Sequence, residues 1–285
     1  INSGAATSDL TSKACSPTTV HWTYDTWMLA NGTGTAITKT GGDTWFFLTA
    51  DYAFGHALER DTTAAITKAG GKVLGGVRTP FPATDFSSFL LQAQSSKAKI
   101  IGLANAGGDT INSIKQASEF GIVKGGQNLA GMLMFISDVH SLGLPISQGL
   151  IFTTPFYWDL NDQTRAFSKR FAAANGGKVP TMVQAGVYAS VLHYLKAVEA
   201  GKTDDGLKVV AKMKELPTDD PLFGKGSIRA DGRKLHAAYL VEVKKPAESK
   251  APWDYLKVRT TIPADQAFRP MDQGECPLVA KTEEQ

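Results

Sequence analysis

Apolar and polar positions follow two alternating patterns in the first half of this chain. Short apolar runs, such as Trp45–Thr49 and Lys99–Leu103, predict buried strands, and each run ends in a loop of small, polar or aromatic residues. Between these runs, apolar residues recur at helical spacing, as from Phe86 to Ala93. Four or five such strand–helix units follow one another between Trp45 and Thr154. This succession predicts an α/β fold with a doubly wound parallel sheet.

The pattern changes after Pro155. Three helical patterns follow, spanning 162–175, 181–200 and 205–216. Residues 226–229, the turn Asp231-Gly232 and residues 235–244 then predict an antiparallel hairpin, and 255–261 predicts a last strand. The second half therefore adds helices and a hairpin to the parallel sheet.

Candidate binding residues lie where the predicted strands end, because ligands of parallel α/β sheets bind outside the carboxyl ends of the strands. Asn105–Asp109 and Asp51–Gly55 are two such loops. The segment Asn2–Thr7 has small residues that let a ligand approach the backbone, and the N–H groups that follow suit a carboxylate. For these loops an ordinary capped turn remains the alternative interpretation.

Composition narrows the class of protein. With 285 residues, of which 42% are hydrophobic and 20% charged, the chain suits one large or two medium globular domains. The net charge of +3 comes from scattered basic residues and gives no reason to expect nucleic acid, and no apolar run reaches transmembrane length. The chain begins Ile1-Asn2-Ser3, without an initiator Met, so we expect processing or truncation.

No residue pattern supports catalysis or a metal site. The sequence contains no GxxxxGK[ST] loop and no GxSxG motif, and its five histidines form no HxxxH or HExxH. Cys15 and Cys276 are either two buried thiols or a disulfide formed in an oxidising compartment. We therefore expect neither metal nor cofactor. The strand-end loops, rich in small, aromatic and amide residues, instead fit a pocket for a small organic molecule.

Five segments keep an order and a spacing that are together fairly specific. They are Asn2–Thr11, Phe46–Asp61, Asp85–Asp109, Gln116–Ile122 and Val187–Gly201. In this order the chain resembles, over essentially its whole length, periplasmic solute-binding proteins of ABC importers. It is similar to the leucine/isoleucine/valine-binding type, which has the type I periplasmic binding fold.

The resemblance implies two doubly wound parallel-sheet lobes that are joined by a hinge and trap a ligand. It implies a first lobe of 1–21 and 155–225, a second lobe of 22–154 and 226–262, and a C-terminal tail of 263–285. A family segment that supplies the opening strands of the first lobe has no counterpart before Asn2. We therefore expect an incomplete first lobe, with the apolar faces of the 162–175 and 181–200 helices open or covered by another chain.

The resemblance also implies the site. Ala5, Ala6 and Thr7 match the segment that holds a ligand carboxylate, and Phe135 stands where branched-chain amino-acid binders carry an acid for the ligand ammonium. The other implied ligand-binding residues are Tyr24, Tyr52, Phe54, Asn105, Ala106, Tyr157, Trp158, Gln184 and Ala185. Because an unpaired buried ammonium is costly, Phe135 favours a ligand without one. Asp109 is the nearest acid, and we interpret it as a helix cap.

These implications predict a periplasmic binding protein, not an enzyme, whose partners are a small-molecule ligand and an ABC transporter membrane permease. The ligand implied is a small organic carboxylate with an aromatic or branched aliphatic body. The alternatives are a branched-chain or neutral amino-acid binding protein, a ligand-sensing regulator on the same fold, and a small-molecule hydrolase. For a periplasmic protein we expect a disulfide between Cys15 and Cys276.

Overall fold

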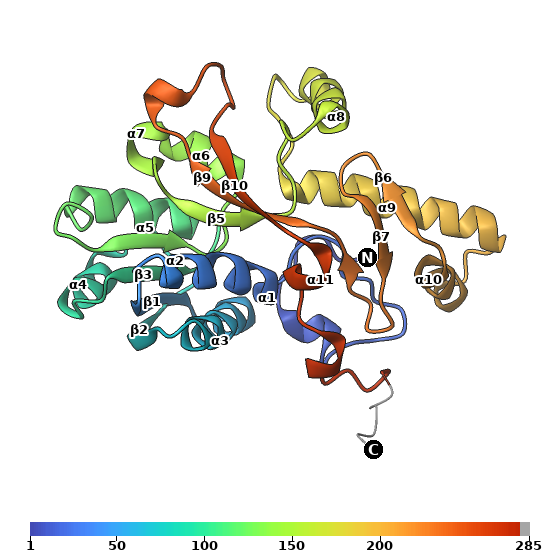
Figure 1. Cartoon of the computed structure of the whole chain (residues 1–285), viewed down its shortest axis with the longest axis horizontal. Coiled ribbons are helices and arrows are strands. Elements are labelled where there is room, and N and C mark those ends of the chain that lie inside the picture. The colour runs from blue at the N-terminus through green and yellow to red at the C-terminus, as the bar shows by residue number, and fades with distance from the viewer. Residues whose placement is uncertain (280–285) are drawn as a thin grey trace. The chain divides into compact units, whose positions relative to one another are not determined.

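The computed structural model describes residues 1–279, which divide into two compact units. Unit 1 comprises Ile1–Asp25, Pro155–Ala238 and the described part of Ile262–Gln285, and unit 2 comprises Thr26–Thr154 and Tyr239–Thr261 (Figure 1). Residues 22–25, 226–238 and Ile262, which the sequence analysis placed in the second lobe, thus fall in unit 1. The predicted tail is grouped with unit 1 as well, and its last six residues lie outside the described part of the chain.

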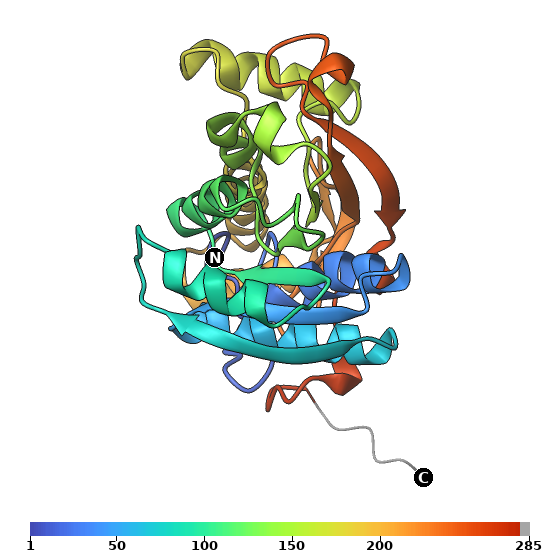
Figure 2. The same cartoon turned by 90° about the vertical axis from the view of Figure 1, so that its left-hand side faces the viewer.

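The centre of unit 2 is a four-stranded parallel sheet in the order β2-β1-β3-β4. Its strands are β1 (Thr44–Ala50), β2 (Lys72–Thr79), β3 (Ile100–Ala104) and β4 (Asn128–Gly131), and its connecting helices are α3 (Ala53–Lys68), α4 (Ser87–Ser95) and α5 (Gly108–Glu119). Figure 1 shows α4 and α5 on one side of this sheet and α3 on the other, and Figure 2 shows β2 at its edge. The predicted doubly wound α/β sheet is confirmed.

Close packing explains why β1 and β3 lie side by side. The Trp45 and Phe47 rings of β1 are fully buried, and Trp45 Nε1 donates to the Gly42 carbonyl at 2.7 Å. Gly102 of β3 faces these rings, and a Cβ atom there would come within 2.5 Å of the Phe47 ring. The glycine therefore lets two large aromatic side chains fill the space between neighbouring strands.

A second sheet of unit 2 joins segments that are distant in sequence. Its order is β10-β9-β5, with β5 (Ile151–Thr154), β9 (Ala238–Val243) and β10 (Leu256–Ile262). Since β5 pairs antiparallel with β9, it does not extend the parallel sheet. The remaining elements are α1 (Thr26–Leu29), the π-helical η2 (Ala30–Gly34), α2 (Thr35–Lys39), α6 (Ile136–Leu142), α7 (Leu144–Ser147) and η3 (Pro246–Glu248).

Unit 1 is mainly helical. Its helices are η1 (Ser8–Thr11), α8 (Asp162–Ala174), α9 (Met182–Gly201), α10 (Gly206–Glu215), α11 (Ala264–Ala267) and η4 (Met271–Gln273). Its small antiparallel sheet has the order β6-β7-β8, with β6 (Thr218–Asp220), β7 (Gly224–Ile228) and β8 (Lys234–Leu235). Parallel pairing is limited, within the described part of unit 1, to the isolated bridges Asn2–His21 and His21–Arg233.

The predicted hairpin is half correct. β7 and β8 pair antiparallel around the Asp231-Gly232 turn, as expected. The predicted second strand, 235–244, is wrong as a single element, because it divides into β8 and β9 and β9 pairs with β5 instead of β7. Pairing of β7 with β6 and β8 is the reason why 226–238 groups with unit 1.

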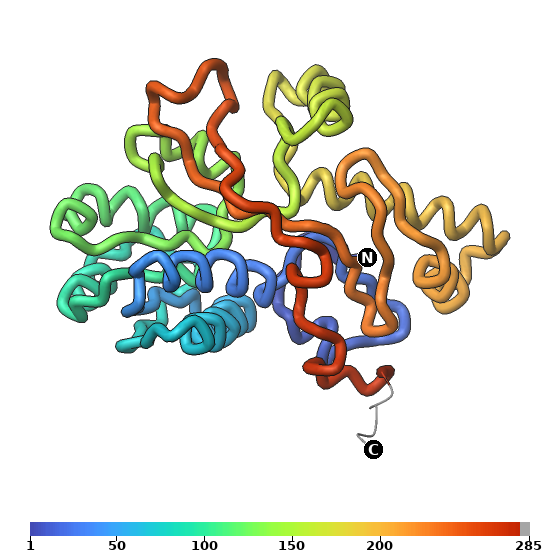
Figure 3. Tube along the Cα trace, in the orientation of Figure 1, coloured from blue at the N-terminus to red at the C-terminus, as the bar shows by residue number. Residues whose placement is uncertain are grey.

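The two ends of the described chain meet in unit 1. Figure 3 shows the N-terminal and C-terminal segments running close together, and Cys15 and Cys276 are joined there by a disulfide with their Cα atoms 5.6 Å apart. Arg269 of the C-terminal segment also donates to the Ser8 carbonyl at 3.0 Å. The predicted disulfide is confirmed, and free thiols are excluded.

Candidate functional site

All five expected site residues of unit 2 follow the carboxyl ends of its parallel strands. Tyr52 and Phe54 follow β1, Asn105 and Ala106 follow β3, and Phe135 follows β4. Because the strands are parallel, these residues lie together along one edge of the sheet, the edge that the carboxyl ends of the strands form.

An aromatic cluster forms the exposed part of this edge. The rings of Tyr52 and Phe81 stack at a centroid distance of 4.4 Å, and the Phe54 ring lies 5.8 Å from that of Tyr52. Tyr52 and Phe81 are 38% and 51% exposed, whereas Phe54 is buried. Large exposed rings at strand ends are suited to contact a flat or branched apolar ligand. Phe81, two residues after the end of β2, was missed by the sequence analysis.

Asp109 lies at the same edge and is not the cap of α5. The N-cap of α5 is Gly107, and the Asp109 carboxylate accepts instead from the Ala83 N–H at 3.3 Å. Its second oxygen, Oδ2, is buried and has no hydrogen-bond partner among the described residues. Burial raises the pKa of Asp109, and burial together with the nearby Asp109 charge raises the pKa of Tyr52. Asp109 therefore provides an unused acceptor next to the aromatic cluster.

Asn105 stabilises the loop between β3 and α5 through hydrogen bonds of its buried side chain. Its side chain is fully buried, its Oδ1 accepts from the Thr110 hydroxyl at 2.7 Å, and its Nδ2 donates to Ser113 Oγ at 3.2 Å. The neighbouring Ala106 is half-buried. In this arrangement the amide fixes the loop that carries Asp109.

Phe135 is the N-cap of α6 and is half-buried. Its N–H donates to the Asp138 carboxylate at 3.0 Å, and burial raises the pKa of Asp138 to about 6. Phe135 thus lies at the start of α6, which its hydrogen bond to the buried Asp138 carboxylate stabilises.

The expected anion-binding segment belongs to unit 1. The Asn2 side chain folds this segment, since its Oδ1 accepts from the N–H groups of Gly4 and Ala5 and its Nδ2 donates to the Ala5 carbonyl. Thr7 Oγ1 accepts from the Asp9 N–H at 3.3 Å, which leaves the Thr7 hydroxyl proton free to be donated. Tyr24 supports the segment by donating its hydroxyl to the Gly4 carbonyl at 3.0 Å.

The other expected residues of unit 1 take different roles. Tyr157 is buried and Trp158 half-buried, with ring centroids 5.9 Å apart. Gln184 Oε1 accepts from the Thr181 N–H at 2.8 Å and so completes a capping box at the start of α9. Ala185 is fully buried.

Metal binding and membrane spanning are two further possibilities for residues 1–279. In that part of the chain, His, Cys, Asp and Glu side chains form no group of three or more that could hold a metal ion. Nor does any helix there have the length and apolarity needed to span a membrane.

Comparison with known proteins places this geometry in a family. Residues 1–250 match the family described as periplasmic binding protein. The chain belongs to this family.

Solved structures support the assignment. A periplasmic binding protein from Burkholderia mallei is 55% identical, has a TM-score of 0.95, and is matched over 97% of this chain and 73% of its own. A branched chain amino acid ABC transporter periplasmic ligand-binding protein from Burkholderia xenovorans is 39% identical, with a TM-score of 0.85 and coverage of 97% and 74%. The type I periplasmic binding fold expected from the sequence is thereby confirmed.

A curated relative, Leu/Ile/Val-binding protein homolog 6 from Brucella melitensis, is 27% identical over 252 residues. The match covers 85% of this chain and 63% of the relative. The chain thus spans less than two thirds of the length of this relative.

Proposed function

We propose that this chain is the solute-binding component of an ABC importer, acting outside the cytoplasm, and that its ligand is a small organic carboxylate with an aromatic or branched aliphatic body. Membership of the periplasmic binding protein family supports the general role. In this proposal the chain binds its ligand and presents it to a membrane permease without chemical change.

The single observation that carries the ligand class is the exposed, stacked pair Tyr52–Phe81 at the carboxyl ends of the strands. Such a pair offers a flat apolar wall that would remove an aryl or branched alkyl group from water. Phe135, in the segment that follows β4, adds a third ring at the same edge and carries no charge. Within unit 1, the Ala5–Thr7 segment has groups that suit a carboxylate, because the Thr7 hydroxyl proton is free and the backbone is unhindered by large side chains.

Asp109 favours a second candidate, a branched-chain or other neutral amino acid. Its buried Oδ2 has no hydrogen-bond partner in the described chain, and an α-ammonium group would provide one. Pairing with a cation would lower the pKa of Asp109 towards its ordinary value. The name of the Burkholderia xenovorans relative points in the same direction.

Calorimetric titration distinguishes the two candidates. We expect binding of benzoate or 4-methylpentanoate and weaker binding of leucine and valine. Micromolar binding of leucine or valine, with no response to either carboxylate, would refute the carboxylate proposal in favour of the amino acid.

Two variants of the same loops sharpen this test. Asp109→Asn should weaken an amino-acid ligand by at least about tenfold, because it removes the charged partner of a buried ammonium, and should leave carboxylate binding unchanged or stronger. Glu119→Gln, which changes an exposed acid at the C-terminal end of α5, away from the strand-end loops, is the matched control and should change neither affinity. Phe135→Glu should weaken a carboxylate by charge repulsion, and an unchanged affinity would show that Phe135 does not face the ligand.

A further inference from the structure

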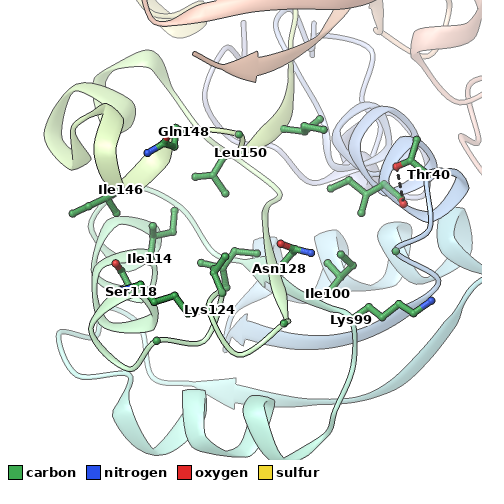
Figure 4. A pocket seen from close by; sticks show the side chains of 18 of the residues that line it. Thr40, Lys99, Ile100, Ile114, Ser118, Lys124, Asn128, Ile146, Gln148 and Leu150 are labelled. Atoms are coloured by element: carbon green, nitrogen blue, oxygen red, sulfur yellow. Dashed lines mark hydrogen bonds between the residues drawn. The ribbon is translucent and has the colours of Figure 1, made fainter. Parts of the chain in front are cut away.

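A cavity of about 830 Å³ opens at the amino ends of the unit 2 strands (Figure 4). The aromatic cluster lies at the other end of the sheet, at the carboxyl ends of the strands. The cavity is lined at the amino ends of β3, β4 and β5, by the end of α2, by the last turns of α5 and the loop that follows, and by α7. All of these elements belong to unit 2. The volume lies in the range of small-molecule pockets, which typically measure about 300–1,000 Å³.

The deep part of the cavity is apolar. Ile100, Ile114 and Leu129 line it and are only 4%, 1% and 8% exposed. Ile146 stands at the mouth and is 40% exposed. In Figure 4 the side chains of Ile114 and Ile146 stand on one side of the hollow, and Ile100 stands on the other. An aliphatic group entering here would lie against these apolar side chains and would itself be removed from water.

Glycine-rich turns keep the mouth open. Gly126 and Gly149 line the cavity with φ angles of +99° and +80°, a region that favours glycine. A Cβ atom at either position would meet nothing within 4 Å, so no neighbouring atom fills the space in front of these turns. These two turns therefore place no side chain of their own in the part of the mouth that they line.

The rim of the cavity is cationic. Two lysines, Lys99 and Lys124, line the cavity, and none of the residues that line it in the described chain is acidic. The Lys99 ammonium is already paired with the Asp43 carboxylate at 2.8 Å and donates to the Gly41 carbonyl at 3.2 Å. Lys124 has no ion-pair or hydrogen-bond partner for its ammonium among the described residues, and Figure 4 places its side chain on the same side as Ile114 and Ile146. An apolar interior beside the Lys124 ammonium, which is unpaired within the described chain, suits an anionic amphiphile.

We propose that this cavity is a second ligand site, separate from the strand-end site, and that it binds a carboxylate with an unbranched aliphatic chain. The chain lies over Ile100, Ile114 and Leu129, and the carboxylate pairs with the Lys124 ammonium. This site lies wholly within unit 2 and does not depend on which solute the strand-end site takes.

The test uses decanoate, below its micelle concentration, and the δ1-methyl NMR signals of isoleucine in the whole chain. Binding should shift the signals of Ile100, Ile114 and Ile146 and leave those of Ile66 and Ile228, which do not line the cavity, unchanged. Decyltrimethylammonium, which has the same chain and the opposite charge, should bind more weakly. Absence of shifts at Ile100 and Ile114, or equal binding of the two amphiphiles, would overturn the proposal.

Charge reversal at the rim tests the contact with the carboxylate. Lys124→Glu should weaken decanoate about fivefold or more, as expected for loss and reversal of a partly exposed ion pair. Lys68→Glu, an exposed lysine of α3 that does not line the cavity, is the matched control and should change the affinity less than about twofold. Equal affinities in the two variants would show that Lys124 does not bind the carboxylate and would overturn the proposed site.

Discussion

In unit 2, four parallel strands are hydrogen-bonded in one sheet, whereas the described part of unit 1 has parallel pairing only at two isolated bridges. Unit 1 is instead held by groups that connect distant segments: the Cys15–Cys276 disulfide, which joins residues 261 positions apart, and the fully buried Arg233. The difference suggests that stability in unit 2 is distributed over a continuous sheet, while in unit 1 a few long-range links carry more of it.

The helices also differ between the units. In α9 the buried side is made of small residues such as Ala185, Ala189 and Ala197, each fully buried. The opposite side exposes larger apolar residues in successive turns: Val187, Tyr188, Val191 and Leu195, with exposed fractions of 49%, 40%, 45% and 56%. The expectation of an open apolar face is confirmed on this helix. On α8 it is wrong, because Phe167 is buried and its ring lies 4.7 Å from that of Tyr188. A continuous face like that of α9 is typical of a surface that another segment covers.

The largest effect is expected at Arg233. Its guanidinium donates to Asp25 Oδ2 at 3.3 Å and to the Thr23 and Lys234 carbonyls, and it lies 4.3 Å from the centre of the Phe268 ring. Arg233→Met would leave the buried Asp25 carboxylate without this cation, so we expect the free energy of unfolding to fall by about 3–5 kcal/mol.

Urea denaturation measures this loss. The control is Arg165→Met, also in unit 1, whose half-exposed side chain pairs with Asp159 and Asp162; it should cost less than about 1 kcal/mol. A similar small loss in both variants would contradict the idea that unit 1 depends on a few buried links.

Removal of the disulfide should have the next largest effect. The double variant Cys15→Ser with Cys276→Ser should lose about 2–4 kcal/mol, because the unfolded chain is no longer constrained. Hydrogen exchange should quicken in η1, α11 and η4, which belong to the terminal segments of unit 1. If protection fell equally in β1 and β3, the two units would unfold as one and the contrast between them would fail.

The sequence was sufficient for elements that are determined locally. The predicted strands 45–49 and 99–103 are β1 (Thr44–Ala50) and β3 (Ile100–Ala104), because a short apolar run between turn residues has few other solutions. However, the alternation of apolar and polar residues does not specify with which other strand a strand pairs. This is why 235–244 was taken as one arm of a hairpin, although β9 pairs with β5, more than eighty residues earlier.

The same limit applies to the candidate site. Tyr52 was found because it follows a predicted strand, but its stacking partner Phe81 comes from the end of a different strand. Asp109 was read as a cap because the Ala83 N–H that it accepts from lies 26 residues away in sequence. The capping role of Gln184, in contrast, could have been read from the sequence, since Thr181 and Gln184 have the spacing of a capping box.

The free energy of unfolding should depend on pH in opposite directions for one buried group in each unit. In unit 2, burial raises the pKa of Asp138 from 3.8 to about 6, so the folded state binds a proton more readily than the unfolded state between these values. The free energy of unfolding therefore falls as the pH rises through this window, and Asp138→Asn should remove the slope and stabilise the protein at pH 7 by about 1–3 kcal/mol.

In unit 1 the sign is reversed. Burial lowers the pKa of Lys234 from 10.5 to about 8, so the unfolded state binds more protons between pH 8 and 10.5. The free energy of unfolding should rise with pH over this range, and Lys234→Met should abolish the rise. Denaturation curves at a series of pH values test both variants; if both flattened the same window, the assignment of these groups to separate pH ranges would be wrong.

The smallest effect on stability, within about 0.5 kcal/mol, is expected on the open face of α9, where Leu195→Lys replaces a side chain that is already 56% exposed. Its effect should appear in self-association, because lysine interrupts the continuous apolar face and adds charge. Leu91→Lys is a matched control, since Leu91 of α4 in unit 2 is also 56% exposed. Sedimentation velocity over a range of concentrations should show less association for Leu195→Lys than for the unmodified chain, and no change for Leu91→Lys. An equal reduction in both would mean that any exposed leucine promotes association and that the α9 face has no special role. Reduction at Leu195 alone would show that the open face of unit 1 is a contact surface, which unit 2 does not share at α4.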